Sequence, residues 1–487
     1  MDLVYLGFET VFSNYTWLYC IYGIVLGTLV GVLPGLGPTA TISMLLPVTY
    51  ALGPIPSIIM LAGIYYGSQY GGSTTAILLN TPGESSAVMT CIDGHKMTQN
   101  GKAGPAIFAA GFSSFIAGVF ATILLVTLSP MLSVLALKFG PAEYCALIAL
   151  GFLSVGILTT GDIVKGLGMC FIGVLIGTIG TDIQTGVIRF AFFDELEDGI
   201  SFPIVAIGLF AFAEIIKNIT KDDVMELYKG TIQLFPSKEE FKRIIPPSIR
   251  GSFIGSFLGL IPGGSSTISS YAAYAIDKRY GNKDADYGEG AIEGVAAPES
   301  ANNAASQTGF IPLLSLGIPE NATMALMLGA LLLTGIVPGP DIVSREPELF
   351  WGLAISMLFG NLLLVILNIP FIKIWVTVLR IPYNTLYPII IAICCIGIYS
   401  INSNVNDIVI TAVLGFAGYI CLMLKLEVAP LMLGLILGPM LEEYFRRAMM
   451  FSDGSFMIFV ERPIAFTLIL FAGVLLAYGI VRTLRNK

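Results

Sequence analysis

Long stretches without charged side chains alternate with short polar segments along this chain. A helix needs roughly 20 apolar residues to cross the ~30 Å hydrocarbon core of a bilayer. Most of the stretches reach that length, so the pattern predicts an all-α polytopic membrane protein. Asp, Glu, Lys and Arg are absent from residues 10–83, 251–276, 300–319, 321–340, 349–372, 381–406 and 463–481.

The two halves of the chain contain similar Gly, Pro and polar residues in the same order. Residues 31–35 (GVLPG) correspond to residues 259–263 (GLIPG), and Asp162 corresponds to Asp407. The offset drifts slowly, from 228 (259 minus 31) to 245 (407 minus 162), whereas chance matches would scatter. We interpret this order as a duplication. The copies cover about residues 20–215 and 250–445.

The distribution of basic residues predicts the topology. Residues 217–250 carry seven Lys and Arg, the C-terminal tail carries more, and no basic residue precedes Lys96. Basic segments stay in the cytoplasm, which places the N-terminus outside and the C-terminus inside. Each repeat then crosses an odd number of times, so we expect two inverted-topology repeats with broken helices and re-entrant hairpins, about 11 spans plus hairpins. The predicted units are residues 1–216 (first repeat), 217–250 (cytoplasmic linker), 251–445 (second repeat) and 446–487 (C-terminal helix and tail).

Composition excludes several classes of protein. Only 12% of the 487 residues are charged, against about 25% in soluble domains. The net charge of −8 argues against nucleic-acid binding. The chain has one His and seven Cys without CxxC spacing, and it lacks Walker A, GxSxG and HExxH sequences. We therefore expect no enzyme activity, no cofactor and no resident metal. Helices broken by Gly and Pro at matching places in two repeats are typical of secondary transporters.

Two breaks are candidate ion sites. Residues 31–39 hold two Pro and three Gly, and a half-helix starting near Thr39 would direct free N–H groups at an anion. The matching break covers residues 260–267. A kink or a surface loop is the alternative. Upstream, the four-residue spacing of Gly251, Gly255 and Gly259 predicts close helix packing.

Two polar segments are candidate substrate sites. In residues 70–84 (YGGSTTAILLNTPGE), the short apolar run suits one arm of a re-entrant hairpin whose tip is residues 80–83. A capped helix–helix loop is the alternative, and Glu84 could cap the next helix. Residues 288–307 contain paired Asn side chains that suit a carboxylate plus an ion. We read Asp162 and Asp407 as helix N-caps and His95 as a loop residue.

These motifs resemble the large membrane subunit of the tripartite tricarboxylate transporters, the TctA family. The resemblance rests on GxxPGxG at 31–37, YGGSTT with LNTPG at 70–83, GVAAPESANNA at 294–304, LGIP at 316–319 and PGP at 338–340. It implies a binding-protein-dependent secondary transporter that imports (tri)carboxylates by cation symport in the bacterial cytoplasmic membrane. The implied partners are a small TctB-like membrane subunit and an extracytoplasmic TctC-like binding protein, and a homodimer stays open.

Substrate and ion contacts follow from the same motifs. The substrate set is Ser73, Thr74, Thr75, Asn80, Thr81, Pro82, Gly83, Ser300, Asn302 and Asn303. The ion set is Gly35, Thr39, Asn80, Ser265, Thr267 and Asn302. One departure is Glu320, which stands where many family members have Gly and which would repel an anion unless a cation lies between them.

The nature of the coupling ion and two other functions stay open. A low number of acids inside the apolar stretches favours Na⁺ over H⁺, because a proton carrier needs a titratable group there. A passive anion channel or a non-transporting membrane scaffold are the alternatives to a transporter.

Overall fold

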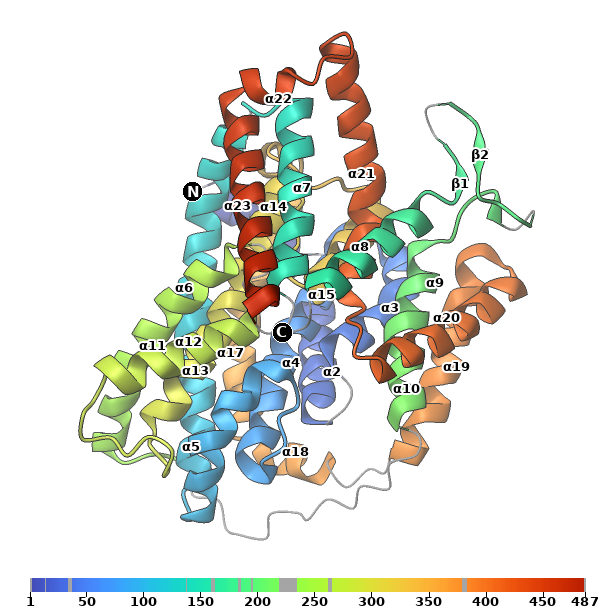
Figure 1. The fold of residues 1–487 in the computed structure, drawn as a ribbon. Coiled ribbons are helices and arrows are strands. Elements are labelled where there is room, and N and C mark those ends of the chain that lie inside the picture. The colour runs from blue at the N-terminus through green and yellow to red at the C-terminus, as the bar shows by residue number, and fades with distance from the viewer. Residues whose placement is uncertain are drawn as a thin grey trace.

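The molecule is built almost entirely from helices (Figure 1), as the sequence predicts. The computed structural model describes residues 2–13, 15–33, 37–136, 138–158, 163–182, 185–193, 196–218, 234–261, 265–378 and 383–485. Within these residues, strands occur only as one short antiparallel hairpin, in which Gly180 pairs with Arg189 and Thr181 with Ile188.

The first half of the chain ends at a segment that leads into the predicted linker. Its elements are α1 (Asp2–Phe12), α2 (Thr16–Val32), α3 (Pro38–Leu52), α4 (Pro54–Leu79), the 3₁₀ turn η1 (Ser85–Ala87), α5 (Val88–Gln99), α6 (Ala103–Ala136), α7 (Pro141–Leu158), α8 (Ile163–Gly177), β1 (Gly180–Thr181), β2 (Ile188–Arg189), α9 (Phe202–Ala206), the π-helical turn η3 (Ile207–Phe212) and α10 (Ala213–Asn218).

The second half begins with a helix that starts inside the predicted linker, at Lys238. Its elements are α11 (Lys238–Gly259), α12 (Ser266–Tyr280), α13 (Glu293–Thr308), α14 (Phe310–Leu316), α15 (Ala322–Leu333), α16 (Ile342–Arg345), α17 (Pro347–Asn368), α18 (Ile372–Val378), α19 (Tyr383–Asn402), α20 (Val405–Met423), α21 (Ala429–Phe451), α22 (Ile458–Glu461) and α23 (Pro463–Arg485).

Two helix pairs are held together by glycines at four-residue spacing. On α2, a Cβ at Gly23, Gly27 or Gly31 would overlap a backbone carbonyl of α4. On α11, the same holds for Gly251, Gly255 and Gly259 against the carbonyls of Ala297, Ala301 and Ala305 on α13. Small residues let the two backbones approach closely, as predicted for α11. Both pairs also have a short helix, α3 or α12, between their members in sequence.

A methyl group at Gly255 should therefore be costly. In Gly255→Ala the new Cβ would overlap the carbonyl oxygen of Ala301, and overpacking of this kind costs roughly 1–3 kcal/mol. We expect a lower thermal unfolding temperature for the purified protein in detergent. The control is Gly473→Ala on α23, where no heavy atom lies within 4 Å and helix propensity should slightly raise stability. Equal unfolding temperatures for the two variants would contradict the packing.

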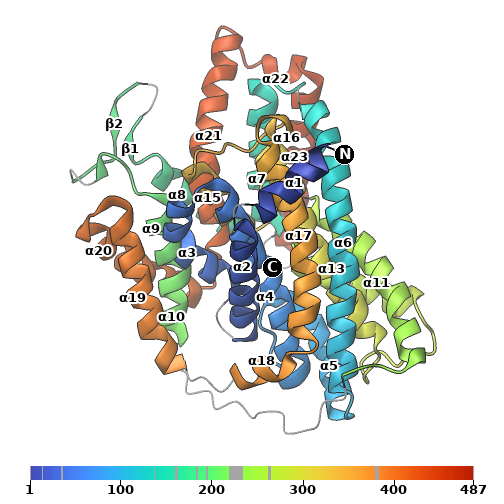
Figure 2. The ribbon, with the colours of Figure 1, turned by 180° about the vertical axis from the view of Figure 1, so that it is seen from behind.

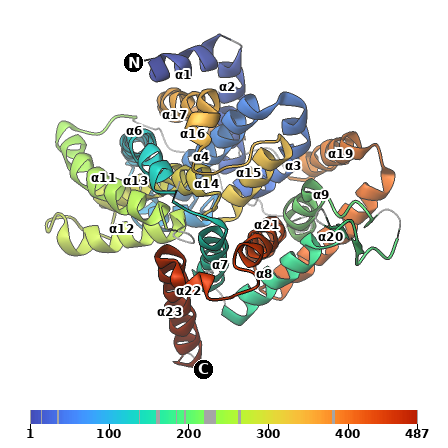
Figure 3. The same cartoon turned by 90° about the horizontal axis from the view of Figure 1, so that it is seen from above.

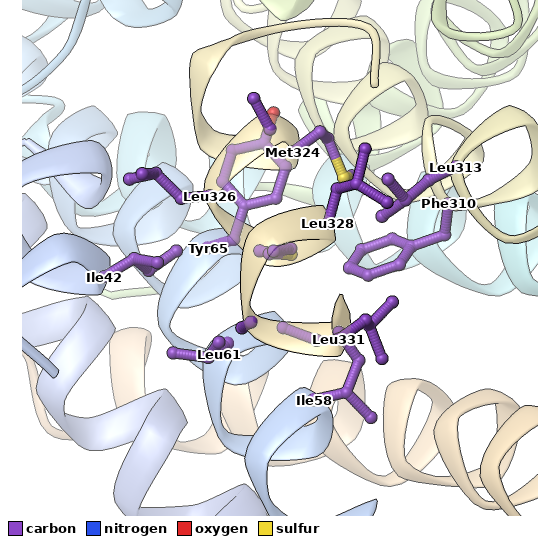
Figure 4. Packing of buried hydrophobic residues seen from close by; sticks show 14 of the residues in the cluster. Ile42, Ile58, Leu61, Tyr65, Phe310, Leu313, Met324, Leu326, Leu328 and Leu331 are labelled. Carbon is purple, nitrogen blue, oxygen red and sulfur yellow. The ribbon is translucent and has the colours of Figure 1, made fainter. Parts of the chain in front are cut away.

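The central core surrounds α15. Figure 4 shows Met324, Leu326, Leu328 and Leu331 of α15 beside side chains of α3, α4 and α14, among them Tyr65 and Phe310. All of the labelled side chains are buried. This apolar packing holds the first residues of α15 close to the first residues of α3.

Two outer groups of helices flank this centre. The helices α7, α8, α21 and α23 pack together on one side, and α19 and α20 pack with η3 and α10 on another (Figure 2). Viewed from above, α11, α12 and α13 lie away from α19 and α20, and the two chain ends lie at opposite sides (Figure 3). The core around α4 and α15 lies between these groups.

The apolar helices support a multi-pass membrane protein. In the described part of the chain, three helices are long and apolar enough to cross a bilayer, namely Ala103–Leu132, Pro347–Asn368 and Val405–Met423. A bent pair, Leu3–Phe12 with Thr16–Val32, would make a fourth, and several apolar helices are shorter. Breaks by Gly and Pro keep many helices short. The expected number of about 11 spans and the inverted repeats stay predictions.

The predicted helix breaks can be compared directly with the observed helices. The break after Val32 and the helix start at Pro38 are confirmed, whereas Gly35, Pro262–Gly264 and Asp162 lie outside the described residues. Gly71 and Gly72 do not interrupt α4, which runs on to Leu79, so the run 76–79 is the end of a long helix. The reason is packing, because a Cβ on Gly71 would overlap the carbonyl of Thr28 on α2.

Three smaller predictions are wrong. His95 lies within α5, where its Nδ1 is 3.2 Å from the carbonyl of Ile77. Asn404 caps α20, and Asp407 instead accepts a hydrogen bond from Asn402. Glu84 makes no side-chain capping bond to η1, which leaves its carboxylate for another role.

Candidate substrate pocket

A large polar pocket lies where four helices begin. It has a volume of about 600 Å³. The first residues of α3, α12, α15 and α21 line it, so four sets of free backbone N–H groups lie around one space. Helix N-termini carry about half a positive charge each and favour anions. The lining residues are Gly37–Ala40, Tyr65, Gln69, Gly83–Ser85, Phe210, Glu214, Ser265–Ile268, Glu320–Thr323, Glu427 and Ala429.

Hydroxyl groups join the helix ends in pairs across the pocket. Thr39 Oγ1 on α3 lies 2.8 Å from Thr323 Oγ1 on α15. Ser85 Oγ lies 2.8 Å from Thr267 Oγ1 on α12. Either partner can donate, so each pair still offers a hydroxyl to a bound oxygen. The Asn321 side chain caps α15 by accepting from Met324 N, and its Nδ2 donates to the hydroxyl of Tyr65.

Four glutamates line this pocket: Glu84, Glu214, Glu320 and Glu427. Glu214 forms an ion pair with Lys217, whereas Glu84 and Glu320 lie at the two Pro-containing turns. Glu320 is 1% exposed and packs on Gly309, and Glu84 packs on Gly72. Each follows a proline closely, Pro82 or Pro319. Within the described residues, Glu84 Oε1 and Glu320 Oε2 are buried without a hydrogen-bond partner, and no Lys or Arg lines the pocket. An anion there meets uncompensated negative charge unless a cation or protons neutralise these groups.

The helix α4 has a second polar face, turned away from this pocket. Tyr65, Gln69 and Gly72 are on the pocket side. Tyr70, Ser73 and Thr74 line a small cavity of about 10 Å³ together with residues of α6, α13 and α17. The spacing of three and four residues places each set on one helix face. One helix therefore separates a large pocket from a water-sized cavity.

The predicted ion set falls mainly in the large pocket. Thr39, Ser265 and Thr267 line it, and so does Gly83 from the predicted substrate set. Gly83 packs against Gly72, and a Cβ there would lie 2.5 Å from the Gly72 Cα. A side chain at this position would push the turn away from α4.

The predicted substrate set is spread over several places. Ser73 and Thr74 line the small cavity, and Asn303 Nδ2 donates to Ser114 Oγ at its edge over 2.7 Å. Three further members bond only to nearby carbonyls: Thr75 to Gly72 O, Thr81 to Leu79 O and Ser300 to Ala297 O. Pro82 is half-buried in the turn before Gly83.

The two remaining Asn residues differ in surroundings. Asn80 ends α4 in the left-handed region (φ 55°) and is exposed. Asn302 is fully buried, and neither its Oδ1 nor its Nδ2 has a partner among the described residues. Asn302 lies seven residues before Gly309, the position on which Glu320 packs. A buried amide without a protein partner can bind a water, an ion or a ligand.

Sequence reasoning missed the buried acids. The sequence pattern favours a capping role for Glu84 and gives no distinct signal for Glu299 within the APESANN motif. Together with Glu320, they show that acidic groups do lie among the packed helices, so the scarcity of acids no longer argues for Na⁺. Glu84 follows Pro82-Gly83 and Glu320 follows Ile318-Pro319 in the sequence, but the packing around these carboxylates was not visible there.

Fold and pocket together define a multi-pass helical membrane protein with an internal polar pocket at interrupted helices. The model of the family described as "Tripartite tricarboxylate transporter TctA family" matches residues 17–433. The chain belongs to this family, whose members are transporter components, and the resemblance found in the sequence is confirmed.

Curated relatives agree with this membership. An Agrobacterium vitis protein named "Uncharacterized 52.8 kDa protein in TAR-I ttuC' 3'region" is 51% identical over 100% of this chain and 98% of its own length. A second A. vitis protein, named for the TAR-II ttuC' 3'region, is 50% identical over 48% of this chain and 96% of its own. An uncharacterised Methanocaldococcus jannaschii protein is 30% identical over 22% of this chain and 27% of its own. No solved structure matches the chain.

Proposed function

We propose that this chain is the translocating subunit of a binding-protein-dependent secondary transporter that imports tricarboxylates or related carboxylates by cation symport. The observation that carries the proposal is the meeting of four helix N-termini and two hydroxyl pairs around one pocket of about 600 Å³. Pockets of roughly 300–1,000 Å³ suit small-molecule ligands.

Carboxylate oxygens would meet donors on three sides of this pocket. The donors are the hydroxyls of Thr39, Thr267 and Thr323 and the first-turn N–H groups of their helices. No Lys or Arg is among the lining residues, so these neutral groups would hold the carboxylate. Broken helices whose N-termini face anionic groups are a recurrent arrangement in secondary transporters. Neutral donors hold an anion without trapping it, which release requires.

The same pocket supplies a reason for cation coupling. Glu84 and Glu320 would repel a substrate carboxylate while they are ionised and unpaired. Neutralising them with a cation lowers that repulsion, so substrate and cation should bind together. This favours a symporter over a passive anion channel, which has no use for acids beside its anion path.

The size of the two sites reverses the assignment expected from the sequence. The large pocket, which holds Thr39, Ser265 and Thr267, has room for a carboxylate, and the cavity beside Ser73 and Thr74 has room for one small ion. We therefore assign the first group to substrate. Asn302 stays a candidate for either site, and Asn80, exposed at the end of α4, is the weakest substrate candidate.

The remaining parts of the proposal concern topology and assembly. We place the protein in the bacterial cytoplasmic membrane with the N-terminus outside and the C-terminus inside, and we treat residues 1–216 and 251–445 as inverted repeats. The helix–break–helix order and glycine packing of α2–α4 and α11–α13 support this. A small TctB-like subunit and an extracytoplasmic TctC-like binding protein would complete the importer.

Uptake of labelled citrate into proteoliposomes that hold this chain and its small subunit tests the function. We expect uptake only with the binding protein outside and an inward cation gradient. Equilibration without a gradient would favour a channel. If no carboxylate tried in turn is taken up, the chain would be a scaffold and the proposed function would be wrong.

A further inference from the structure

A buried carboxylate lies on the far side of α4 from the substrate pocket. Glu299 is 1% exposed on α13. Its Oε2 accepts a hydrogen bond of 2.6 Å from Ser73 Oγ, and its Oε1 accepts one from Thr90 Oγ1 on α5. No Lys, Arg or His of the described residues forms an ion pair with it. Its negative charge therefore lacks a counter-charge from the protein.

A small cavity adjoins this carboxylate, and its lining combines apolar residues with side-chain oxygen atoms. Four helices meet there: α4, α6, α13 and α17. The cavity of about 10 Å³ is close to the size of one water molecule. Beside Glu299, its polar lining comes from Tyr70, Ser73, Thr74, Ser114 and Asn368.

Two of the lining groups are themselves buried and unpaired. The Tyr70 side chain is 3% exposed and the Asn368 side chain 2% exposed. Neither Tyr70 OH nor Asn368 Oδ1 has a hydrogen-bond partner in the part of the chain that the structure describes. Asn368 Nδ2 already donates to Leu364 O over 3.0 Å, so the amide oxygen is left over as an acceptor. Buried polar groups are nearly always paired, so these two leave a hydroxyl and an amide oxygen for a small bound species.

We propose that this cavity binds one Na⁺ ion, held by the Glu299 carboxylate, the Asn368 amide oxygen and the Tyr70 hydroxyl, with Ser73, Thr74 and Ser114 completing an all-oxygen shell. Hard cations take carboxylate, carbonyl and hydroxyl oxygens. A single positive charge would neutralise Glu299, and an anion would be repelled. The proposal extends the proposed transport function by naming where its coupling ion sits, but it predicts Na⁺ binding whether or not a carboxylate is carried.

The position of the cavity suggests how an ion bound there would affect the charge in the substrate pocket. Ser73 donates to Glu299, and its neighbour Gly72 touches Glu84 at the pocket wall. The two sites are therefore joined through two consecutive residues of α4. An ion beside Glu299 changes the charge felt by Glu84, so occupancy of one site bears on the other.

Na⁺ binding to the purified chain in detergent tests the proposal without any carboxylate present. The assay is saturable ²²Na⁺ binding against choline chloride at equal ionic strength, because choline is too large for the cavity. The variants are Tyr70→Phe, Asn368→Ala and Glu299→Gln. The matched control is Tyr66→Phe, a buried tyrosine on the same helix whose hydroxyl lies near Cys20 Sγ and not in the cavity.

We expect the unmodified chain and Tyr66→Phe to bind Na⁺ equally, Tyr70→Phe and Asn368→Ala to bind at least tenfold more weakly, and Glu299→Gln to lose binding. If Glu299→Gln fails to fold, the Na⁺ affinities of Tyr70→Phe and Tyr66→Phe still test the site. If Tyr70→Phe and Tyr66→Phe bind Na⁺ with equal affinity, or if the unmodified chain shows no saturable Na⁺ binding, the proposed Na⁺ site is wrong. The cavity would then hold a water molecule. Na⁺ binding without binding of any carboxylate would instead refute the proposed function alone.

Discussion

Replacing Thr267 with Asp should reduce the affinity of the purified chain for a tricarboxylate by about 100-fold. Thr267 lies in the first turn of α12 and lines the proposed substrate pocket. A new carboxylate about 5 Å from a substrate carboxylate costs ~3 kcal/mol at an effective dielectric constant of about 20, and ~1.4 kcal/mol is tenfold. An acid in the first turn favours the helix itself, so the variant should fold. Equilibrium binding of labelled citrate gives the measurement.

The control for this variant is Thr267→Asn, which has nearly the same shape and no charge. It removes the hydroxyl pairing with Ser85 but keeps a donor, so we expect a loss of no more than a few fold. If the Asp and Asn variants bind citrate equally, charge at the start of α12 does not matter and the substrate lies elsewhere.

Removing the Asp93 side chain should destabilise the protein near α12 and α13. Asp93 is fully buried on α5, and its Oδ1 accepts from the backbone N–H groups of Gly288, Gly290 and Ala291 at 2.8–2.9 Å. Its Oδ2 accepts from Tyr274 OH on α12. Asp93→Ala leaves all these donors unpaired, and each buried orphan costs roughly 1–3 kcal/mol. We expect an unfolding temperature lower by several degrees.

Limited trypsin digestion makes this prediction specific to the loop. In Asp93→Ala, residues 281–292 lose their anchor, and cleavage at Lys283 should speed up at least tenfold. Asp286, exposed on the same loop, supplies the control, and Asp286→Ala should digest like the unmodified chain. Unchanged cleavage in Asp93→Ala would show that the loop is held by other contacts.

Local chain chemistry made the helix breaks predictable. Two prolines and three glycines between Gly31 and Pro38 cannot continue a helix, and α2 does end at Val32 before α3 starts at Pro38. The glycine spacing on α11 likewise predicted its close contact with α13. These features depend on a few neighbouring residues, which the sequence shows directly.

Features that depend on distant partners were not predictable. Gly71 and Gly72 look like a helix break, but the approach of α2 makes them part of a continuous α4. His95 follows Asp93 and Gly94 and looks like loop, but the carbonyl of Ile77 and the packing of α5 on α4 keep it helical. Local propensity favoured a turn in both cases, and tertiary contacts prevailed.

The candidate site was predicted in part for the same reason. Motif residues such as Thr39, Ser265 and Thr267 do line one pocket, because each stands at the start of an interrupted helix. The helix packing decides which side of α4 each hydroxyl faces. It also buries Glu299, Glu320 and the Oε1 atom of the half-buried Glu84 without basic partners among the described residues. The size of each space, on which the proposed assignment to substrate or ion rests, is likewise a property of the packing.

A cryo-electron microscopy structure of the chain with citrate and Na⁺ tests the central claim most directly. The account predicts density for the carboxylate between the first turns of α3, α12 and α15, within reach of Thr39, Thr267 and Thr323, and no such density in Thr267→Asp. Citrate density outside this pocket, for example at the turn that the exposed Asn80 begins, would contradict it.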